Sequence, residues 1–192
     1  MNEEKQVSFS LAPGAPVLLY QHDGIAKSGI VDQVLRLRAS DNGLIAVNNV
    51  TLSEVSLSVL RDHTALLRCP CILTGTVMEN LTLNRSGVSI DQLYIHLKAF
   101  GLDAVFANLP DGLKTRVSPL SHPFTVPEVC LINWVRALMK EPKFWVIDGF
   151  LDLLRDAERQ RLLDVILEFD ALVLITTASK RLAAKFDKKV LL

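Results

Sequence analysis

Hydrophobic runs alternate with longer amphipathic stretches along most of this chain. Apolar runs of strand length occupy residues 7–11, 16–20, 43–47, 64–68, 144–148, 171–177 and 188–192. The runs at 144–148 (FWVID) and 171–177 (ALVLITT) are continuous, with no alternation of polar and apolar positions. That pattern is typical of strands buried on both faces of a parallel sheet. These two segments are therefore predicted to be strands of such a sheet, buried on both faces.

Segments with helical periodicity lie between the apolar runs, at 27–37, 89–100, 127–140 and 155–169. Ser89 is a suitable N-cap for the second helix, and Pro127 suits the first turn of the third. The third helix has an almost unbroken apolar body, which predicts that it is buried. Strands alternating with helices favour an α/β fold with a largely parallel sheet.

Composition and charge narrow the classes of protein. The chain has 192 residues, which favours a single domain over 1–192 with one sizeable core. Its 21 basic and 21 acidic residues form no basic block, so no nucleic-acid surface is predicted. No apolar run approaches the roughly 20 residues that span a bilayer, and the charged N-terminus resembles no secretory signal. We therefore expect a cytoplasmic protein.

The residues that commonly bind metals show no promising spacing. Cys69, Cys71 and Cys130 fit neither a disulfide framework nor a zinc site, and we expect them to be buried thiols. The histidines are scattered and share no ligand spacing. Neither residue type predicts a metal centre.

The stretch LLYQHDGIAKSGIVDQVL (18–35) has the layout of a phosphate-binding loop: an apolar strand, a polar turn and a helix-like run. Such loops aim backbone N–H groups and a helix N-terminus at the anion, with a lysine reaching the outer phosphates. A serine or threonine hydroxyl then holds the magnesium ion. Here Lys27 and Ser28 match the end of the pattern G-x-x-x-x-G-K-[ST], and Gly24 falls in its middle, where one more glycine is often found.

The same stretch departs from the pattern at two glycine positions, which hold Gln21 and Ala26. Alanine at a position that needs positive φ costs about 1–2 kcal/mol. On the motif alone, an ordinary turn before a helix explains the string equally well. Lys27 and Ser28 would then be solvent-exposed residues at a helix start.

Four segments resemble those of ATP-binding cassette (ABC) ATPases, in family order. LLRCPCILTGTVMENLTL (66–83) is similar to the region after the Q-loop of exporters, and residues 41–67 resemble the stretch before it. LPDGLKTRV (109–117) and RALMKEPKFWVID (136–148) are similar to later segments, the last ending at the Walker B aspartate, Asp148. The matching residues of the first segment are Pro70, Gly75, Thr76, Asn80 and Leu81.

The resemblance implies a P-loop NTPase-like fold, with a mostly parallel sheet flanked by helices and a reduced N-terminal β part. A core of about 7–68 and 136–192 would hold a helical subdomain of about 69–135. The phosphates of ATP would lie against Gly24, Ala26, Lys27 and Ser28. Ser28 and Asp148 would hold Mg²⁺.

Nearly every catalytic position of the family is replaced. Arg68 stands for the Q-loop glutamine, Gly149 for the glutamate after Walker B, and Thr177 for the switch histidine. The signature LSGGQ falls on FTVPE (124–128), where Pro127 has no backbone N–H. Losing a general base typically costs 10²–10⁴ in rate, on the order of the cost of losing preorganised donors. We therefore expect no catalytic residue and impaired hydrolysis.

The hypothesis from these patterns is a degenerate ABC-type nucleotide-binding subunit or domain with a structural or regulatory role, binding ATP and Mg²⁺ weakly or not at all. Its partners would be a membrane-embedded transporter subunit, docked through residues around 69–82 and 118–128, and another ABC ATPase domain in a homo- or heterodimer. It would lie peripherally at the inner face of a membrane. The alternatives are an ABC-like interaction module that binds no nucleotide and an active ATPase in which Arg68 acts on phosphate.

Overall fold

A five-stranded parallel sheet forms the centre of the molecule. A computed structural model describes residues 8–20, 25–39, 43–47 and 50–191, except the side chains of 25–28 and 47. The strands are β1 (Val17–Tyr20), β4 (Thr64–Leu67), β7 (Phe144–Asp148), β8 (Leu172–Thr177) and β9 (Lys189–Leu191). Their order is β4-β7-β8-β1-β9, and every neighbouring pair is parallel. The α/β class is confirmed, and the runs at 144–148 and 171–177 lie side by side in this parallel sheet as β7 and β8.

Helices cover both faces of this sheet, which explains why its central strands are continuously apolar. Because side chains alternate along a strand, Val17 and Leu19 of β1 point to one face and Leu18 to the other. Val17 and Leu19 pack in one cluster with Val31 and Val34 of helix α1 (Ile25–Val34). Leu18 belongs to the larger cluster, together with residues of α6 (Val126–Leu138) and α7 (Asp156–Leu167).

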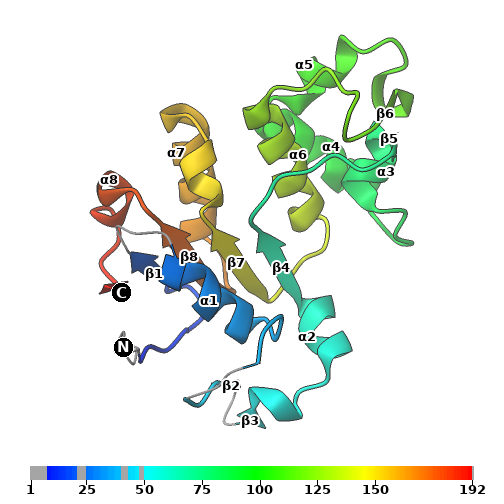
Figure 1. The fold of residues 1–192 in the computed structure, drawn as a ribbon. Helices are drawn as coiled ribbons and strands as arrows, with labels where there is room; N and C mark the ends of the chain where they lie inside the picture. Colours follow the sequence, from blue (N-terminus) through cyan, green and yellow to red (C-terminus); the bar gives the residue numbers. More distant parts are fainter. Residues whose placement is uncertain (1–7, 21–24, 40–42, 48–49, 192) are drawn as a thin grey trace.

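The remaining elements are short. The helices are α2 (Leu57–His63), α3 (Val77–Thr82), α4 (Ile90–Ala99), α5 (Leu102–Ala107) and α8 (Lys180–Ala183). The 3₁₀ helices are η1 (Leu52–Glu54), η2 (Gly112–Lys114) and η3 (Phe150–Leu153). Two antiparallel pairs join β2 (Ala46–Val47) to β3 (Val50–Thr51) and β5 (Gly75–Thr76) to β6 (Arg116–Val117). Helices α3 to α6 gather beyond the carboxyl end of β4 (Figure 1).

Local capping fixes where several helices begin. The Ser89 hydroxyl accepts the Gln92 N–H at the start of α4, as predicted, and Pro127 lies in the first turn of α6. Helix α3, which the hydrophobic pattern did not predict, has a reciprocal capping box. The Thr76 N–H donates to Glu79 Oε2 at 2.6 Å, and the Glu79 N–H donates to Thr76 Oγ1 at 3.1 Å. The sequence T-x-x-E is itself the signal for this helix start.

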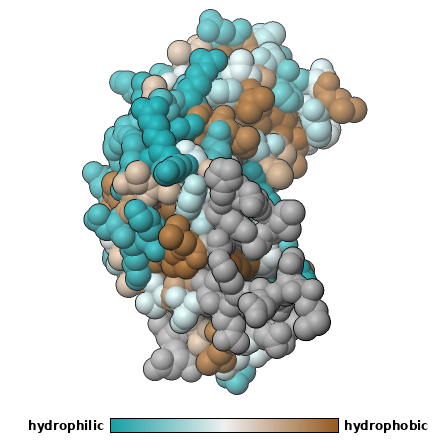
Figure 2. Space-filling model, turned by 60° about the vertical axis from the view of Figure 1, so that its left-hand side comes forward, coloured by the Kyte–Doolittle hydropathy of each residue, from teal (hydrophilic) through white to brown (hydrophobic). Residues whose placement is uncertain are grey.

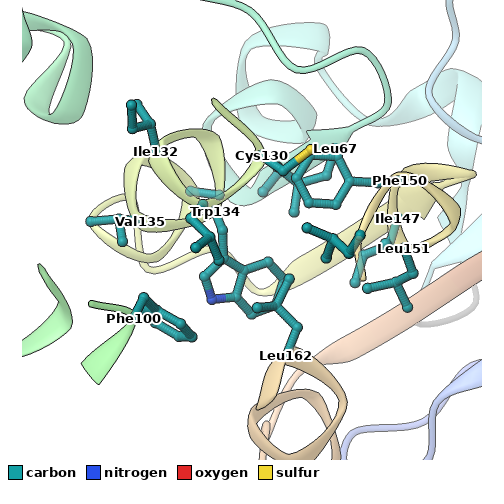
Figure 3. Packing of buried hydrophobic residues seen from close by; sticks show 14 of the residues in the cluster. Leu67, Phe100, Cys130, Ile132, Trp134, Val135, Ile147, Phe150, Leu151 and Leu162 are labelled. Carbon is teal, nitrogen blue, oxygen red and sulfur yellow. The ribbon is translucent and has the colours of Figure 1, made fainter. Parts of the chain in front are cut away.

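The larger cluster forms one continuous core between the sheet and helices α3 to α7. Trp134 of α6 is fully buried at its centre (Figure 3), with its ring centroid 5.2 Å from that of Trp145 on β7. Phe169 stacks on Trp145 at 4.7 Å. Both tryptophans are core residues, and the predicted burial of the third helix is confirmed. The division of the chain near residues 69 and 135 stays a prediction.

Two strand predictions were wrong in extent. Residues 8–11 form no strand, and an isolated bridge joins Ala12 to Ala15 instead. The turn through Pro13 and Gly14 ends this run before it could pair with a neighbour. Of 43–47, Ala46 and Val47 alone are in a strand, because Gly43 has φ of +95° and Leu44 projects into solvent. An apolar run without a pairing partner does not become a strand.

Candidate functional site

An open depression of about 520 Å³ lies at the carboxyl ends of β4, β7 and β8. Parallel strands place their carboxyl ends at one edge of a sheet, so residues from distant parts of the chain meet there. The depression is lined by Arg68, Cys69, Pro70, Asp148, Gly149, Asp152, Leu153, Thr176, Thr177 and Ala178. Arg68, Gly149 and Thr177, where the sequence resemblance predicts replaced catalytic residues, thus come together with Asp148.

The Arg68 guanidinium links three elements at this edge. Its Nε donates to Asp148 Oδ2 at 2.5 Å, and its Nη2 donates to Asp32 Oδ1 at 2.7 Å. Arg68 directly follows β4, Asp148 ends β7 and Asp32 lies on α1. The Asp148 side chain is 7% exposed, whereas Arg68 and Asp32 are 29% and 30% exposed. The acidic pair therefore shares one guanidinium at the rim of the core.

This guanidinium is permanently charged. Partial burial alone would lower the pKa of Arg68, but the hydrogen bonds that it donates to Asp32 and Asp148 and the negative charges of these residues outweigh it and raise the pKa above its ordinary value. Arginine does not deprotonate in proteins even without such help. The positive charge beside Asp148 is thus present at every pH at which the chain is folded.

The second oxygen of Asp148 is also engaged. Thr176 Oγ1 donates to Asp148 Oδ1 at 2.5 Å, and the Gly149 N–H donates to Thr176 Oγ1 at 3.0 Å. Gly149 has a left-handed φ of +64°, which turns the chain from β7 into η3. Each oxygen of Asp148 therefore accepts a hydrogen bond from the protein itself.

Asp152 forms a second anchored carboxylate in the depression. Thr177 Oγ1 donates to Asp152 Oδ1 at 2.5 Å, and the Ala178 N–H donates to Asp152 Oδ2 at 3.0 Å. These bonds tie η3 to the end of β8. The sequence pattern did not assign Asp152 or Asp32 to the site. The available signal was their place in the chain, since Asp152 lies four residues after Walker B and Asp32 five after Lys27.

The described side chains do not fit the magnesium ion that the ABC resemblance implies. Mg²⁺ binds hard oxygen ligands, but Asp148 Oδ2 already carries a guanidinium N–H and Oδ1 a hydroxyl. A divalent cation about 4 Å from that guanidinium would meet a Coulomb repulsion of roughly 2–8 kcal/mol for effective dielectric constants of about 80 to 20. The described residues also contain no group of three or more His, Cys, Asp or Glu side chains suited to a metal.

The predicted phosphate loop lies mostly beyond what the structure describes. Gly24 is outside the described residues. Ala26, Lys27 and Ser28 belong to the start of α1, but their side chains are not described. The assignment of these residues to phosphate and of Ser28 to metal thus stays a prediction.

The cysteines depart from expectation, because Cys69 and Cys71 are exposed and Cys130 alone is buried. Cys69 and Cys71 follow β4 where the chain leaves the sheet, so their side chains are not enclosed by it. Cys130 lies on the buried body of α6, where burial raises the pKa of its thiol to about 11. The prediction of buried thiols was therefore wrong for two of these residues.

The sequence is similar to curated ABC transporter ATP-binding proteins. It is 28% identical over 143 residues to YknV of Bacillus subtilis, an uncharacterized ABC transporter ATP-binding protein, covering 74% of this chain and 24% of the relative. It is 26% identical over 166 residues to YheH of the same organism, a probable multidrug resistance ABC transporter ATP-binding/permease protein, covering 84% and 25%. The chain thus spans about a quarter of these relatives. No protein-family model matches the sequence.

The fold is similar to that of a solved transporter. A bacterial Atm1-family ABC exporter with ATP bound superposes with a TM-score of 0.82 at 21% identity, covering 97% of this chain and 33% of the exporter chain. Among the described helices, none is long and apolar enough to cross a membrane. The sequence similarity and the shared parallel-sheet fold point in the same direction. By both, this chain is a relative of the ATP-binding domains of ABC transporters.

Proposed function

We propose that this chain is a degenerate ABC-type nucleotide-binding subunit or domain, impaired in ATP hydrolysis, with a structural or regulatory role in a transporter-like assembly. One observation carries the proposal. The carboxylates that line the depression are Asp148 and Asp152, and both oxygens of each accept hydrogen bonds from the chain itself. A general base must instead accept a proton from the attacking water. Gly149, at the position of the family glutamate, offers backbone atoms alone.

Residual binding of ATP is a separate part of the proposal. The relatives are ATP-binding proteins by name, and Lys27 and Ser28 retain the phosphate-loop residue types. The start of α1 at Ile25 is compatible with a helix N-terminus facing a phosphate. Two features argue against strong binding of ATP: Ala26 stands at a glycine position of the phosphate-loop pattern, and both oxygens of Asp148 already accept hydrogen bonds. ATP is therefore expected to bind weakly, or not at all.

A membrane-embedded partner is supported by the relatives and by exposed apolar side chains. YheH is an ATP-binding/permease protein, and the structural neighbour is an exporter. In the segments proposed to dock, Leu120 is fully exposed, and Leu73 and Val126 also project into solvent. On the face shown in Figure 2, hydrophobic residues gather at the upper right, opposite a largely hydrophilic left side. The chain would act at the cytoplasmic face of a membrane, in a homo- or heterodimer with another ABC ATPase domain.

ATP turnover by the purified chain tests this function. Phosphate release with ATP and Mg²⁺ should not exceed that of the Lys27→Ala variant, which removes the lysine expected to reach the phosphates. Robust release that Lys27→Ala abolishes would overturn the proposal and favour an active ATPase. The geometry opposes that alternative, because Arg68 is held between Asp32 and Asp148 and is not a free cation for phosphate.

Thermal stability distinguishes the proposal from an interaction module that binds no nucleotide. Residual binding predicts that millimolar ATP raises the Tm of the chain but not of Lys27→Ala, by the usual linkage of ligand binding to stability. Equal Tm values with and without ATP would favour the interaction module. The observation that favours this second function is that both oxygens of Asp148 already accept hydrogen bonds from the chain.

A further inference from the structure

We infer that Arg68 is the resident cation of this site, and that its guanidinium takes the place between α1 and β7 that a divalent metal would otherwise occupy. The two carboxylates it joins, Asp32 and Asp148, come from the two elements that carry the predicted phosphate loop and the Walker B strand. The inference concerns the metal alone. It deepens the proposed function but does not depend on whether ATP is hydrolysed.

The burial of Asp148 makes a cation necessary at this position. A carboxylate that is 7% exposed is costly to keep ionised unless it is paired and hydrogen-bonded. Arg68 supplies one charged hydrogen bond, and Thr176 supplies a neutral one. The positive charge that a metal would provide to the buried Asp148 carboxylate is therefore provided by Arg68.

The geometry of the guanidinium explains how one side chain can serve two carboxylates. Its N–H groups form a rigid planar fork, and here Nε and Nη2 reach different acids at 2.5 and 2.7 Å. Asp32 and Asp148 therefore approach the same cation from α1 and β7. Without Arg68 they would face each other as a pair of like charges, which is the arrangement that attracts a hard divalent cation.

The consequence for a nucleotide ligand rests on the proposed function. Where a metal would otherwise help an ATP-binding domain hold phosphate, this chain has a guanidinium that is already paired with Asp32 and Asp148. Because this guanidinium occupies the place of a divalent metal, Mg²⁺ should not strengthen the binding of a nucleoside triphosphate. Any affinity for ATP should be the same in EDTA as in Mg²⁺.

Manganese binding, followed by electron paramagnetic resonance, tests the inference on the full chain, since Mn²⁺ takes the same oxygen ligands as Mg²⁺. The wild-type chain should leave the signal of free Mn²⁺ unchanged at this site. Arg68→Gln should bind one Mn²⁺ per chain at least about tenfold more tightly, because it frees two carboxylates and adds an amide oxygen. Adding Asp148→Asn to Arg68→Gln should abolish that gain.

Two further variants serve as controls. Arg159→Gln removes another half-buried arginine, which donates to Leu151 O, Leu154 O and Asp156, none of which lines the depression. This variant should bind Mn²⁺ no better than the wild type. Arg68→Lys keeps a charge and should still exclude Mn²⁺.

Two outcomes would overturn the inference. One is that the wild-type chain binds Mn²⁺ and that Asp148→Asn removes this binding. This measurement does not depend on whether the Arg68→Gln variant folds. The other is a folded Arg68→Gln chain with no gain in Mn²⁺ binding. ATP turnover is measured in a separate experiment. A chain that hydrolyses ATP would refute the proposed function but would not change the interpretation of the manganese measurement.

Discussion

Two arginines fasten this molecule in different ways, one at the sheet edge and one among the helices. Arg68 donates to two carboxylates at the end of β4. Arg136, on α6, donates to neutral acceptors: Asn80 O at 2.6 Å, Asn80 Oδ1 and Asn133 Oδ1 at 3.0 Å, and Cys71 O at 3.2 Å. The first bridge involves charged partners from separate elements, whereas the second completes the hydrogen bonding of one segment.

The neutral network replaces a missing strand partner. Residues 71–74 run in irregular backbone between β4 and β5. The Asn80 side chain accepts the Leu73 N–H at 2.7 Å and donates to Leu73 O at 2.9 Å, in the manner of a neighbouring strand. Asn133 does the same for Cys71, at 3.3 and 3.0 Å. Each buried amide thus satisfies backbone groups that would otherwise be costly to bury.

The contrast shows which arginine serves the fold and which occupies a site. A fully satisfied neutral network rigidifies the segment it holds and leaves no polar group that a ligand would need to satisfy. A charged bridge at the rim of an open depression satisfies its carboxylates in the way a bound metal could. The same residue type is structural in one region and a substitute for a ligand in the other.

The largest expected effect comes from breaking the neutral network at its most buried member. Asn80→Ala should lower the free energy of unfolding by about 3–5 kcal/mol, because it strands the Leu73 N–H and C=O and takes an acceptor from Arg136. Urea unfolding measures this loss. Asn108→Ala, which removes one exposed bond to Ala104 O, is the matched control and should cost less than about 1 kcal/mol. Equal losses in the two variants would contradict the structural role.

A smaller loss is expected at the charged bridge. Asp148→Asn should cost about 1–3 kcal/mol, because the neutral amide weakens the bond to Arg68 while Asp32 still pairs with the guanidinium. Asp156→Asn is the control, since its carboxylate is 65% exposed although it also contacts two arginines. Its cost should stay below about 1 kcal/mol. A chain that is no less stable with Asp148→Asn would show that the bridge has no net stabilising value.

The capping box of α3, next to the neutral network, predicts a dependence on pH. Hydrogen bonds from Thr76 hold the pKa of Glu79 below its ordinary 4.5. The bond from the Thr76 backbone N–H contributes most, and the bond from the Thr76 hydroxyl contributes next. A lowered folded pKa means that the stabilisation is complete above the ordinary value and is lost as pH falls through the folded one. The Tm difference between the wild type and Glu79→Gln should therefore be largest near neutral pH and shrink in acid. A constant difference would contradict the assignment.

The smallest effect concerns the three cysteines, of which Cys69 follows Arg68 in the chain and Cys71 accepts a hydrogen bond from Arg136. Iodoacetamide at mildly alkaline pH should alkylate Cys69 and Cys71 in the native chain, because both are exposed. Cys130 should react on unfolding alone, since burial raises its pKa to about 11 and hides it from the reagent. Mass spectrometry of the intact chain counts the labels. Native labelling of Cys130 would mean that α6 opens readily.

The sheet was predictable from the sequence because its strands are continuous apolar runs. The segments 144–148 and 171–177 match β7 and β8 within one residue, since burial on both faces leaves no polar position to confuse the pattern. The run at 7–11 failed because pairing depends on a partner that the local pattern does not contain. Helix α3 was missed although its capping box is written in the sequence, because it spans only 6 residues, too few to show a helical period.

The candidate site was predictable in part. The family resemblance singled out Arg68, Gly149, Thr177 and Asp148, and these residues do line one depression. It did not predict the bond between Arg68 and Asp32, because these residues lie 36 positions apart and meet through the packing of α1 on the sheet. Such a contact is a property of tertiary structure, and no local pattern in a single sequence encodes it.

The two tryptophans in contact provide an intrinsic spectroscopic probe of how α6 packs on the sheet. Trp134 comes from helix α6 and Trp145 from strand β7, with ring centroids 5.2 Å apart and planes inclined by 37°. Chromophores at that separation couple, so their circular dichroism depends on how the helix sits against the strand. Any tilt of α6 away from the sheet could be followed in solution without attaching a dye.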